Sequence, residues 1–444
     1  MTRDSLTITR FPPSPTGYLH IGRARTALFN FLFTKHYDGK MIFRLEDTDK
    51  ARSKKEFEKD IVEGLDWLGI TYDEGPFRQS ERTKIYQTYL RAMIEKGSAY
   101  EAEDSNEGEG KVVRLKNPNT TITFTDLIRG DIVFNTTELG DFVIARNINE
   151  PLYHLAVVVD DFEMEITHVI RGEDGISNTP RQILLQEAIG ASRPVYAHIP
   201  FILAPDKSKL SGRHGAVSLK EYREAGYLPE ALVNYLALLG WHPTNEREIF
   251  SMEELIKEFD LSRVQKGGAV FDEEKLKSMN KIYIAKLSDD DFLRYTKKFM
   301  PDLVRRTSGY NDEKLAQMTP LIRERVHTFG EIADMAGELD YFFGAPEYNA
   351  QALVWKDDTP GIAHKHLEHI AKVLEKIPEN TFTVESIKSA LWDYATREGR
   401  GSVLWPMRYA LSGKEKSPDP FTLAAVLGKT ETLARLKTAL VKLS

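Results

Sequence analysis

The stretch RFPPSPTGYLHIGR, residues 10–23, separates two apolar segments of different periodicity. Residues 6–10 have the composition of a short buried strand, whereas the prolines and glycines of residues 12–17 break regular structure. Residues 22–37 then carry apolar side chains at helical spacing. Residues 40–45 predict a second strand and residues 54–68 a second helix. This strand–helix alternation predicts an α/β fold with a doubly wound parallel sheet, which binds ligands at the carboxyl ends of its strands.

Two further regions have a different texture. Residues 102–151 hold short strand-like segments at 112–115, 121–124, 131–134 and 142–144, which predict an inserted antiparallel module of small α+β type. Segments 157–160 and 166–170 are expected to be strands that resume the main sheet. Beyond residue 250 the pattern is almost wholly helical, with helices expected at 252–259, 289–299, 312–326, 362–376, 384–398, 421–427 and 429–443.

Composition limits the classes of protein to consider. A chain of 444 residues should form two to four compact units, and its 41% hydrophobic and 29% charged content is that of a globular protein. No apolar run approaches the roughly 20 residues that span a bilayer, so no membrane partner is expected. The absence of cysteine excludes disulfides and thiolate metal sites, and the first residues lack a signal-peptide core, so we expect a cytoplasmic protein. The net charge of −7 gives no indication of nucleic acid, which would have to bind local basic patches.

Two segments have the composition of phosphate-binding elements. In the first, Gly17 and Gly22 allow close backbone approach, the predicted helix offers free N–H groups, and His20 can hydrogen-bond phosphate oxygens. The second, KSKLSGR at residues 207–213, places three cations and two hydroxyls in seven residues and suits a leaving pyrophosphate. Taken singly, each segment is also compatible with an ordinary surface turn or a solvated basic loop.

Together and in this order, the two segments resemble the HIGH and KMSKS signatures of class I aminoacyl-tRNA synthetases. Nearly the whole chain resembles the bacterial-type glutamyl-tRNA synthetase family. The resemblance implies a Rossmann-type catalytic domain at residues 1–101 and 152–204, interrupted by an acceptor-end-binding module at 102–151. It further implies a KMSKS loop and stem-contact region at 205–288 and an all-helical anticodon-binding part at 289–444.

The resemblance also implies roles for individual residues. His20, Lys209, Ser211 and Arg213 match the catalytic signatures. Arg10, Ser14, Glu46, Tyr153 and Arg171 match residues that meet the substrate glutamate, where an arginine pair selects a carboxylate over an amide. ATP is expected to contact Pro13, Thr16, Gly17, His20, Gly22, Arg23, Glu173 and Lys209. Asp160 and Asp161 are expected to face the nucleotide or the tRNA end, and Arg397, Arg400 and Arg408 to contact tRNA.

The chain departs from the family pattern at a few positions. Pro12 replaces the usual alanine, Arg23 a small residue, and Gly212 the second lysine of the KMSKS signature, whose loss Lys209 and Arg213, with Lys207 or Arg23, are expected to cover. The family's Cys/His zinc module follows the position of Tyr100, but this chain has no cysteine and a shortened segment there, so no structural zinc and no protein-bound metal site is expected.

The implied activity is ATP-dependent esterification of tRNA by glutamate, with Mg²⁺ accompanying ATP and a monomeric protein. Whether tRNA-Gln is charged besides tRNA-Glu stays open. A glutaminyl enzyme would carry a β-barrel C-terminal part, and a queuosine-modifying glutamyl transferase would lack the helical tail. A catalytically weakened tRNA-binding paralogue is the remaining alternative, favoured only by Gly212.

Overall fold

The computed structural model describes residues 6–103, 111–210, 218–307 and 309–444. The chain divides into two compact units, Met1–Tyr283 and Ile284–Ser444. Each unit is described by itself.

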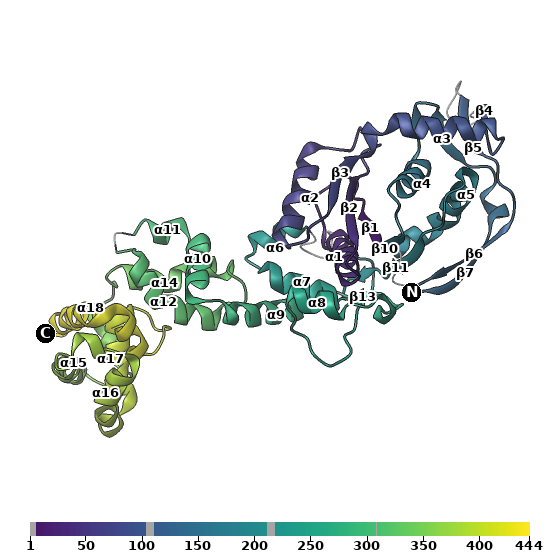
Figure 1. The fold of residues 1–444 in the computed structure, drawn as a ribbon. Coiled ribbons are helices and arrows are strands. Elements are labelled where there is room, and N and C mark those ends of the chain that lie inside the picture. The colour runs from purple at the N-terminus through teal and green to yellow at the C-terminus, as the bar shows by residue number, and fades with distance from the viewer. Residues whose placement is uncertain (1–5, 104–110, 211–217, 308) are drawn as a thin grey trace. The chain divides into compact units, whose positions relative to one another are not determined.

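Parallel strands form the centre of the first unit (Figure 1). β1 (Ile8–Phe11), β2 (Lys40–Leu45) and β3 (Glu74–Arg78) pair in that order, and β10 (His168–Gly172) pairs in parallel with β11 (Val195–Ile199). The backbone N–H of Thr167 donates to the Ile8 carbonyl over 3.0 Å and joins β10 to the free side of β1. The strands therefore run β3-β2-β1-β10-β11, and the chain order reverses between β1 and β10, where such folds bind their ligands.

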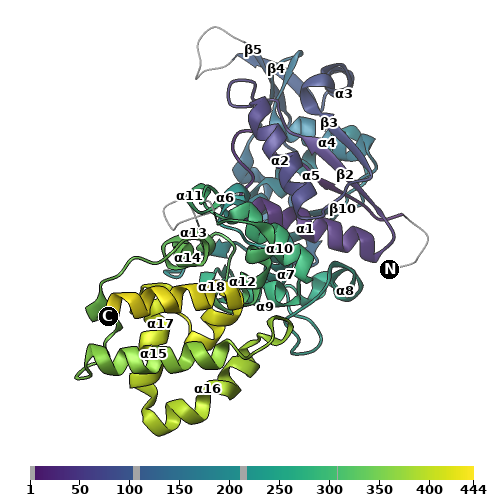
Figure 2. The same ribbon diagram turned by 90° about the vertical axis from the view of Figure 1, so that its left-hand side faces the viewer.

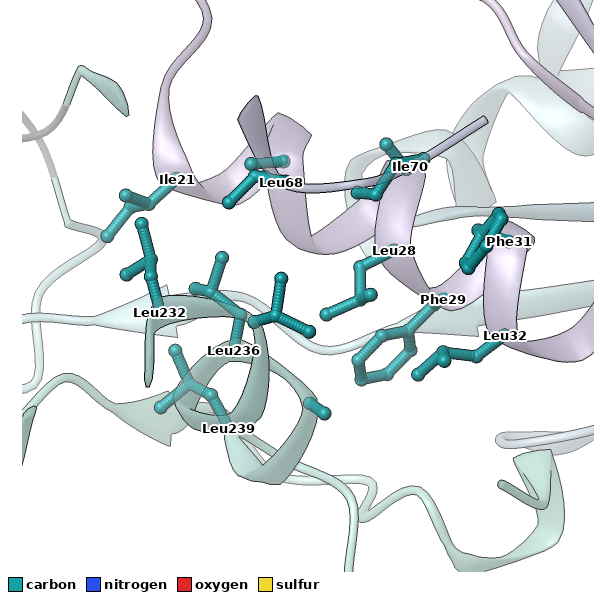
Figure 3. Close-up of a cluster of buried hydrophobic side chains, with 14 of the residues drawn as sticks. Ile21, Leu28, Phe29, Phe31, Leu32, Leu68, Ile70, Leu232, Leu236 and Leu239 are labelled. Atoms are coloured by element: carbon teal, nitrogen blue, oxygen red, sulfur yellow. The ribbon is translucent and has the colours of Figure 1, made fainter. Parts of the chain in front are cut away.

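Helices cover this sheet and complete its core. α1 (Ile21–His36) packs against α7 (Pro229–Leu238), and Figure 3 shows Phe29 of α1 close to Leu236 of α7. Both of those side chains are fully buried. The other helices of the unit are α2 (Lys55–Trp67), α3 (Thr83–Glu95), α4 (Tyr153–Glu163), α5 (Thr179–Ile189), α6 (Leu219–Glu224) and α8 (Met252–Glu258), and α9 (Glu273–Lys286) crosses the boundary between the units.

The segment expected to form one inserted module divides between two sheets. β4 (Ala99–Glu103), β5 (Lys111–Leu115), β8 (Val143–Asn147) and β9 (Glu150–Pro151) form an antiparallel sheet in that order. The hairpin of β6 (Thr121–Asp126) and β7 (Gly130–Asn135) instead joins β11, because Asp126 pairs in parallel with Tyr196. The hairpin thus extends the sheet of β10 and β11, and the strand order there is β10-β11-β6-β7. The short strands β12 (Ile202–Leu203) and β13 (Ala269–Val270) form a separate parallel pair.

One secondary-structure prediction was wrong. Residues 157–160, expected as a strand, lie inside helix α4. The apolar run of residues 155–159 is buried on all sides, and an apolar run of that length has the same pattern in a buried helix as in a buried strand. The strand expected at 166–170 does form, shifted to β10.

The second unit is helical throughout its described residues. Helices α15 (Pro360–Leu374), α16 (Val384–Glu398), α17 (Arg400–Ser412) and α18 (Pro420–Leu443) pack on one another (Figure 2). Gly428 has a φ of 77° and breaks α18 between the two helices that the sequence predicted. The preceding helices are α10 (Asp289–Phe299), α11 (Asp302–Arg305), α12 (Asp312–Arg325), α13 (Glu331–Asp334) and α14 (Ala336–Phe343). In neither unit do the described residues include a helix with the length and apolar character that crossing a bilayer requires.

Candidate active site

A cleft of about 650 Å³ opens at the carboxyl ends of β1, β2 and β10. Most of the residues that the sequence singled out line it: Arg10, Pro13, Ser14, His20, Gly22, Arg23, Glu46, Tyr153, Arg171 and Lys209. These residues come from segments up to 199 positions apart, between Arg10 and Lys209. The reversal of strand order between β1 and β10 explains why they meet, since side chains at that edge converge from both halves of the sheet.

His20 begins helix α1 and is held in one orientation. Its Nδ1 accepts a hydrogen bond from the Arg23 backbone N–H over 3.3 Å and so caps the helix. A Cβ atom at position 22 would lie 3.1 Å from two atoms of the imidazole, so Gly22 leaves the ring room to fold over the first turn. Desolvation in the cleft, with the cations Arg23 and Lys209 nearby, lowers the pKa of His20 to about 4. The ring is therefore neutral at physiological pH, and its Nε2–H is available to donate to an anion.

Arg23, the departure from the family pattern, also points into the cleft. Its Nη1 donates to the Ser14 carbonyl over 2.9 Å, which ties the Pro-rich loop to the first turn of α1. Burial lowers the pKa of Arg23, and the nearby carboxylates of Glu46 and Asp174 oppose this shift. Arg23 thus adds a positive charge to the part of the cleft around His20.

Lys207 and Lys209 are the cations of the second segment that the structure describes, and Lys209 lines the cleft. The Nζ of Lys209 lies 4.3 Å from the centroid of the Phe201 ring, a cation–π contact. The backbone of Lys209 forms an isolated antiparallel bridge with Leu203, the last residue of β12. Ser211, Gly212 and Arg213 lie outside the described residues.

Two further arginines line the cleft and lie near each other. Arg10, at 1% exposure, donates from Nη1 to the Ile170 carbonyl at 3.4 Å, and its Nε lies 3.4 Å from the Asp161 carboxylate. Arg171 donates from Nη2 to the Gly175 carbonyl at 3.0 Å and to Thr179 Oγ1 at 2.8 Å. Two guanidinium groups near each other can bind a carboxylate through charge-assisted hydrogen bonds.

Among the described residues, Glu46 is one of two carboxylate side chains that line the cleft, and Asp174 is the other. Glu46 follows β2, its backbone N–H donates to the Pro13 carbonyl at 3.0 Å, and its side chain is buried. Burial raises the pKa of Glu46 to about 7, although Arg44 and Arg10 pull in the opposite direction. Beside it, the charge of Glu46 is the main cause that raises the pKa of Tyr153 to about 12. A ligand ammonium group would restore the ionised form of Glu46.

The prediction that Asp160 and Asp161 face the nucleotide or the tRNA end was wrong. Asp160 is fully buried and accepts from Gln79, Arg82 and Tyr86 at 2.7 to 3.0 Å, while Asp161 pairs with Arg44 and Arg10. The error follows from the strand prediction, because in helix α4 both carboxylates turn into the protein instead of standing at a strand end.

Three residues expected at ATP do not line the cleft: Thr16, Gly17 and Glu173. Glu173 uses both carboxylate oxygens inside the protein, accepting from Arg129 Nη2 at 2.5 Å and from the Phe201 backbone N–H at 2.6 Å. The sequence missed other lining residues, among them Asp174 and Asn178. Asp174 lies two residues beyond the Arg171-Gly172 strand end, which is the signal that could have identified it, and Asn178 ends the short helical segment that follows.

The predicted tRNA contacts lie in the second unit, beside aromatic rings. Arg400 lies over the Trp392 ring at 4.4 Å, Arg397 over Tyr394 at 5.6 Å and Arg408 over Trp405 at 4.9 Å. Arg408 also donates to the Glu415 carbonyl over 2.8 Å and is half-buried, whereas Arg397 and Arg400 are exposed. Stacked cations next to aromatic faces suit nucleic acid.

No group of three or more His, Asp or Glu side chains within the described ranges is arranged to hold a metal ion.

Comparison with known proteins identifies the family. The model of the class I tRNA synthetase (E and Q) catalytic domain matches residues 7–108 and 101–278, and that of an anticodon binding domain matches residues 291–440. The glutamate–tRNA ligase of Aquifex aeolicus is 42% identical over 98% of this chain and 99% of its own length. That of Carboxydothermus hydrogenoformans is 41% identical over 96% of this chain and 98% of its own.

A solved structure agrees with these relatives. The crystal structure of a glutamate–tRNA ligase from Elizabethkingia meningosepticum, in complex with its amino acid, superposes with a TM-score of 0.87 at 34% identity. The superposition covers 99% of this chain and 100% of the Elizabethkingia chain. The predicted fold class, a Rossmann-type parallel sheet followed by a helical anticodon-binding part, is confirmed.

Proposed function

The chain belongs to the class I tRNA synthetases of the glutamyl and glutaminyl (E and Q) type, and we propose that it is a glutamate–tRNA ligase whose substrates meet in the cleft around His20 and Arg171. The observation that carries the proposal is the charge arrangement of that cleft. Arg10, Arg171 and Glu46 lie near one another around Tyr153, and His20 lies near the cations Arg23 and Lys209. Glutamate offers two carboxylates and an ammonium group, and ATP offers phosphates, so the arrangement suits both substrates.

The first step joins the two substrates. An oxygen of the glutamate α-carboxylate attacks the α-phosphorus of ATP, the bond to the bridging oxygen breaks, and pyrophosphate leaves with the electron pair. In the second step a hydroxyl of the terminal adenosine of tRNA attacks the carbonyl of glutamyl-adenylate, and AMP leaves. By family resemblance this is the 2′-hydroxyl, and the first step requires bound tRNA.

The protein's share in this chemistry is positioning and electrostatic stabilisation. Glu46, with Tyr153 beside it, receives the α-ammonium group, and Arg10 and Arg171, with Ser14, receive carboxylate oxygens. The neutral His20 donates from Nε2 to the triphosphate beside the N–H groups of the first turn of α1. Lys209 and Arg23 face the phosphates, together with Pro13 and Gly22. The charges of Lys209 and Arg213, with Lys207 or Arg23, are proposed to cover the loss of the lysine that Gly212 replaces.

Mg²⁺ enters the proposal as part of the substrate, MgATP. ATP phosphates bind Mg²⁺ in such reactions, so the ion would reach the cleft with the nucleotide. Thr16, Gly17 and Glu173 stay predictions as ATP contacts.

The second unit is proposed to bind the anticodon end of tRNA through Arg397, Arg400 and Arg408. A monomeric state in the cytoplasm, the division at residues 101, 151, 204 and 288, and the functions of those segments also stay predictions.

Aminoacylation with radiolabelled glutamate tests the proposal, with tRNA-Glu and tRNA-Gln transcripts assayed in parallel in the presence of MgATP. Charging of tRNA-Glu alone supports a discriminating ligase, and charging of both supports an enzyme that also supplies glutamyl-tRNA-Gln. Charging of neither, with tRNA binding retained, would overturn the proposal in favour of a catalytically weakened paralogue. Lys209→Ala sharpens the test, since a variant that activated glutamate like the wild type would exclude a role for Lys209 at the phosphates.

A further inference from the structure

A buried chain of three side chains runs from the β6–β7 hairpin to the cleft. Asp126, the last residue of β6, pairs with Nδ1 of His198 over 2.6 Å, and Nε2 of His198 lies 3.1 Å from Nε of Arg171. Asp126 and His198 are 1% and 0% exposed. Neither residue lines the cleft, and the sequence motifs include neither of them.

The protonation state of His198 follows from its partners. The Nε–H of an arginine can only donate, so His198 must accept at Nε2 and carry its hydrogen on Nδ1, which donates to Asp126. Burial lowers the pKa of His198 and keeps the ring neutral. His198 Nδ1–H requires an ionised Asp126, and hydrogen bonds hold the pKa of Asp126 below its usual range.

Asp126 is itself fixed by the backbone. Its Oδ1 accepts from the N–H groups of Ile128 and Arg129 at 3.0 and 2.9 Å, and its Oδ2 accepts from the N–H of His198 at 3.1 Å. The carboxylate therefore cannot rotate without losing three backbone hydrogen bonds. Each link of the chain is oriented by the link before it.

Arg171 is oriented by the end of this chain. Three of its N–H groups are engaged, with Nε bound to His198 and Nη2 bound to both Gly175 and Thr179. A side chain at position 175 would collide with the guanidinium group, so Gly175 allows the close packing. Nη1 has no partner among the residues that the structure describes, and Arg171 lines the cleft.

We propose that Asp126 and His198 are positioning residues that fix the guanidinium plane of Arg171, so that Nη1 is presented to a carboxylate of the substrate glutamate. The inference rests on the proposed role of Arg171 in binding glutamate. It implies that the hairpin supports amino-acid recognition, a role separate from any contact it makes with tRNA.

Asp126→Asn tests the proposal with almost no change of shape. The backbone N–H groups at 128 and 129 hold the amide oxygen in the place of Oδ1, so the amide NH₂ faces both Nδ1 and the backbone N–H of His198. Two donors then meet, and His198 must move its hydrogen to Nε2, where it opposes the Nε–H of Arg171. We expect the KM for glutamate to rise at least about tenfold, while the KM values for ATP and tRNA change less than about twofold.

A matched control and a second substitution separate positioning from general damage. Asp131→Asn makes the same chemical change on the exposed strand of the same hairpin and should leave all three KM values unchanged. His198→Gln, which can offer an oxygen to Arg171, should retain more glutamate affinity than His198→Leu, which cannot. Equal losses in these two variants would overturn the proposal, as would an Asp126→Asn variant whose KM values all rise together or do not change.

Arg171→Lys separates this inference from the proposed function. A normal KM for glutamate in Arg171→Lys would contradict the proposed binding role of Arg171 itself. A raised KM in Arg171→Lys with a normal KM in Asp126→Asn would overturn the positioning chain alone. If the chain works as proposed, adding Asp126→Asn to Arg171→Lys raises the KM by a smaller factor than Asp126→Asn does in the wild type, because both changes act on one guanidinium group.

Discussion

Arg44 and Asp161 form an ion pair in the interior beneath the cleft, with Arg44 Nη2 lying 2.8 Å from Asp161 Oδ1. Arg44 is fully buried, and its Nε also lies 3.7 Å from the carboxylate of Asp160, which is buried as well. Arg44 therefore lies between two adjacent carboxylates of helix α4, of which Asp160 also pairs with Arg82 Nε at 2.7 Å and Asp161 also faces Arg10. The ion pair holds β1, β2 and α4 together at the floor of the cleft.

Arg44→Met should unfold far more easily than the wild type. The substitution removes the closest cation from buried Asp161, which keeps only Arg10 at 3.4 Å, and breaking a buried pair in this way costs about 3–5 kcal/mol. Urea denaturation measures the loss as a lower transition midpoint. Arg52→Met is the control, because Arg52 is 75% exposed in its pair with Asp49 and should cost at most about 1 kcal/mol. Similar losses in the two variants would show that the ion pair of Arg44 contributes little.

Glu46→Gln should gain stability and lose function. Because burial raises the pKa of Glu46 from 4.5 to about 7, the native state holds its proton more tightly than the unfolded state does. The penalty of burying the carboxylate is therefore absent below pH 4.5 and fully present above pH 7, where it amounts to at most about 3 kcal/mol. We expect Glu46→Gln to raise the melting temperature at pH 8 but not at pH 4.5, and to weaken glutamate binding much more at pH 8 than at pH 4.5. A lower melting temperature at pH 8 would contradict this account.

The same pKa sets the pH dependence of glutamate binding by the wild type. Below pH 7 the free protein increasingly carries Glu46 as the neutral acid, which attracts an ammonium group less than the carboxylate does. kcat/KM for glutamate should thus fall as the pH is lowered through about 7, and this break should be missing in Glu46→Gln. His20 adds no break near neutrality, since its pKa is about 4. Pyrophosphate exchange in the presence of tRNA, measured across pH for the wild type and for Glu46→Gln, gives the two pH profiles.

His20→Asn should separate the two roles of the histidine. Asparagine is a good N-cap and can still accept from the Arg23 N–H, so helix α1 and the stability of the fold should be retained. Its side chain is too short to bring a donor to the place of Nε2, and the loss of one preorganised donor lowers kcat by about 10²–10³. His20→Ala should show the same loss of kcat together with about 1 kcal/mol less stability. Retained kcat in His20→Asn would exclude the donor role.

The sequence predicted those parts of the site that are local in the chain. Arg10, His20, Glu46 and Arg171 each stand at or just beyond the end of a strand or at the start of a helix, and the alternation of elements places such ends together. Residues 157–160 were wrongly predicted as a strand, because burial on every side removes the apolar periodicity that distinguishes a helix from a strand. The Asp126–His198 pair could not be predicted, since it depends on β6 pairing with β11 rather than with the inserted strands, and the two residues are 72 positions apart.

Arg400→Ala tests whether the second unit binds tRNA by charge. The guanidinium of Arg400 and the Nζ of Lys388 lie 4.4 and 5.0 Å from the ring of Trp392, so an aromatic face and two cations are available together. Removing one phosphate contact should lower tRNA affinity uniformly across tRNA-Glu sequences and reduce the slope of log Kd against log salt by about 1. Anisotropy of labelled tRNA-Glu at several salt concentrations gives both quantities.

Lys437→Ala is the matched control for that measurement. Lys437 on α18 is also a cation and is 67% exposed. Its Nζ lies 3.8 Å from the carboxylate of Glu375 instead of over an aromatic ring. If Arg400 contacts tRNA, only its variant changes the salt slope, and the pH dependence of glutamate binding stays as in the wild type, because no part of the cleft has been altered. Equal slopes in the two variants would mean that the cation beside Trp392 is ordinary solvated surface, and the search for the anticodon contact would move to Arg397 and Arg408.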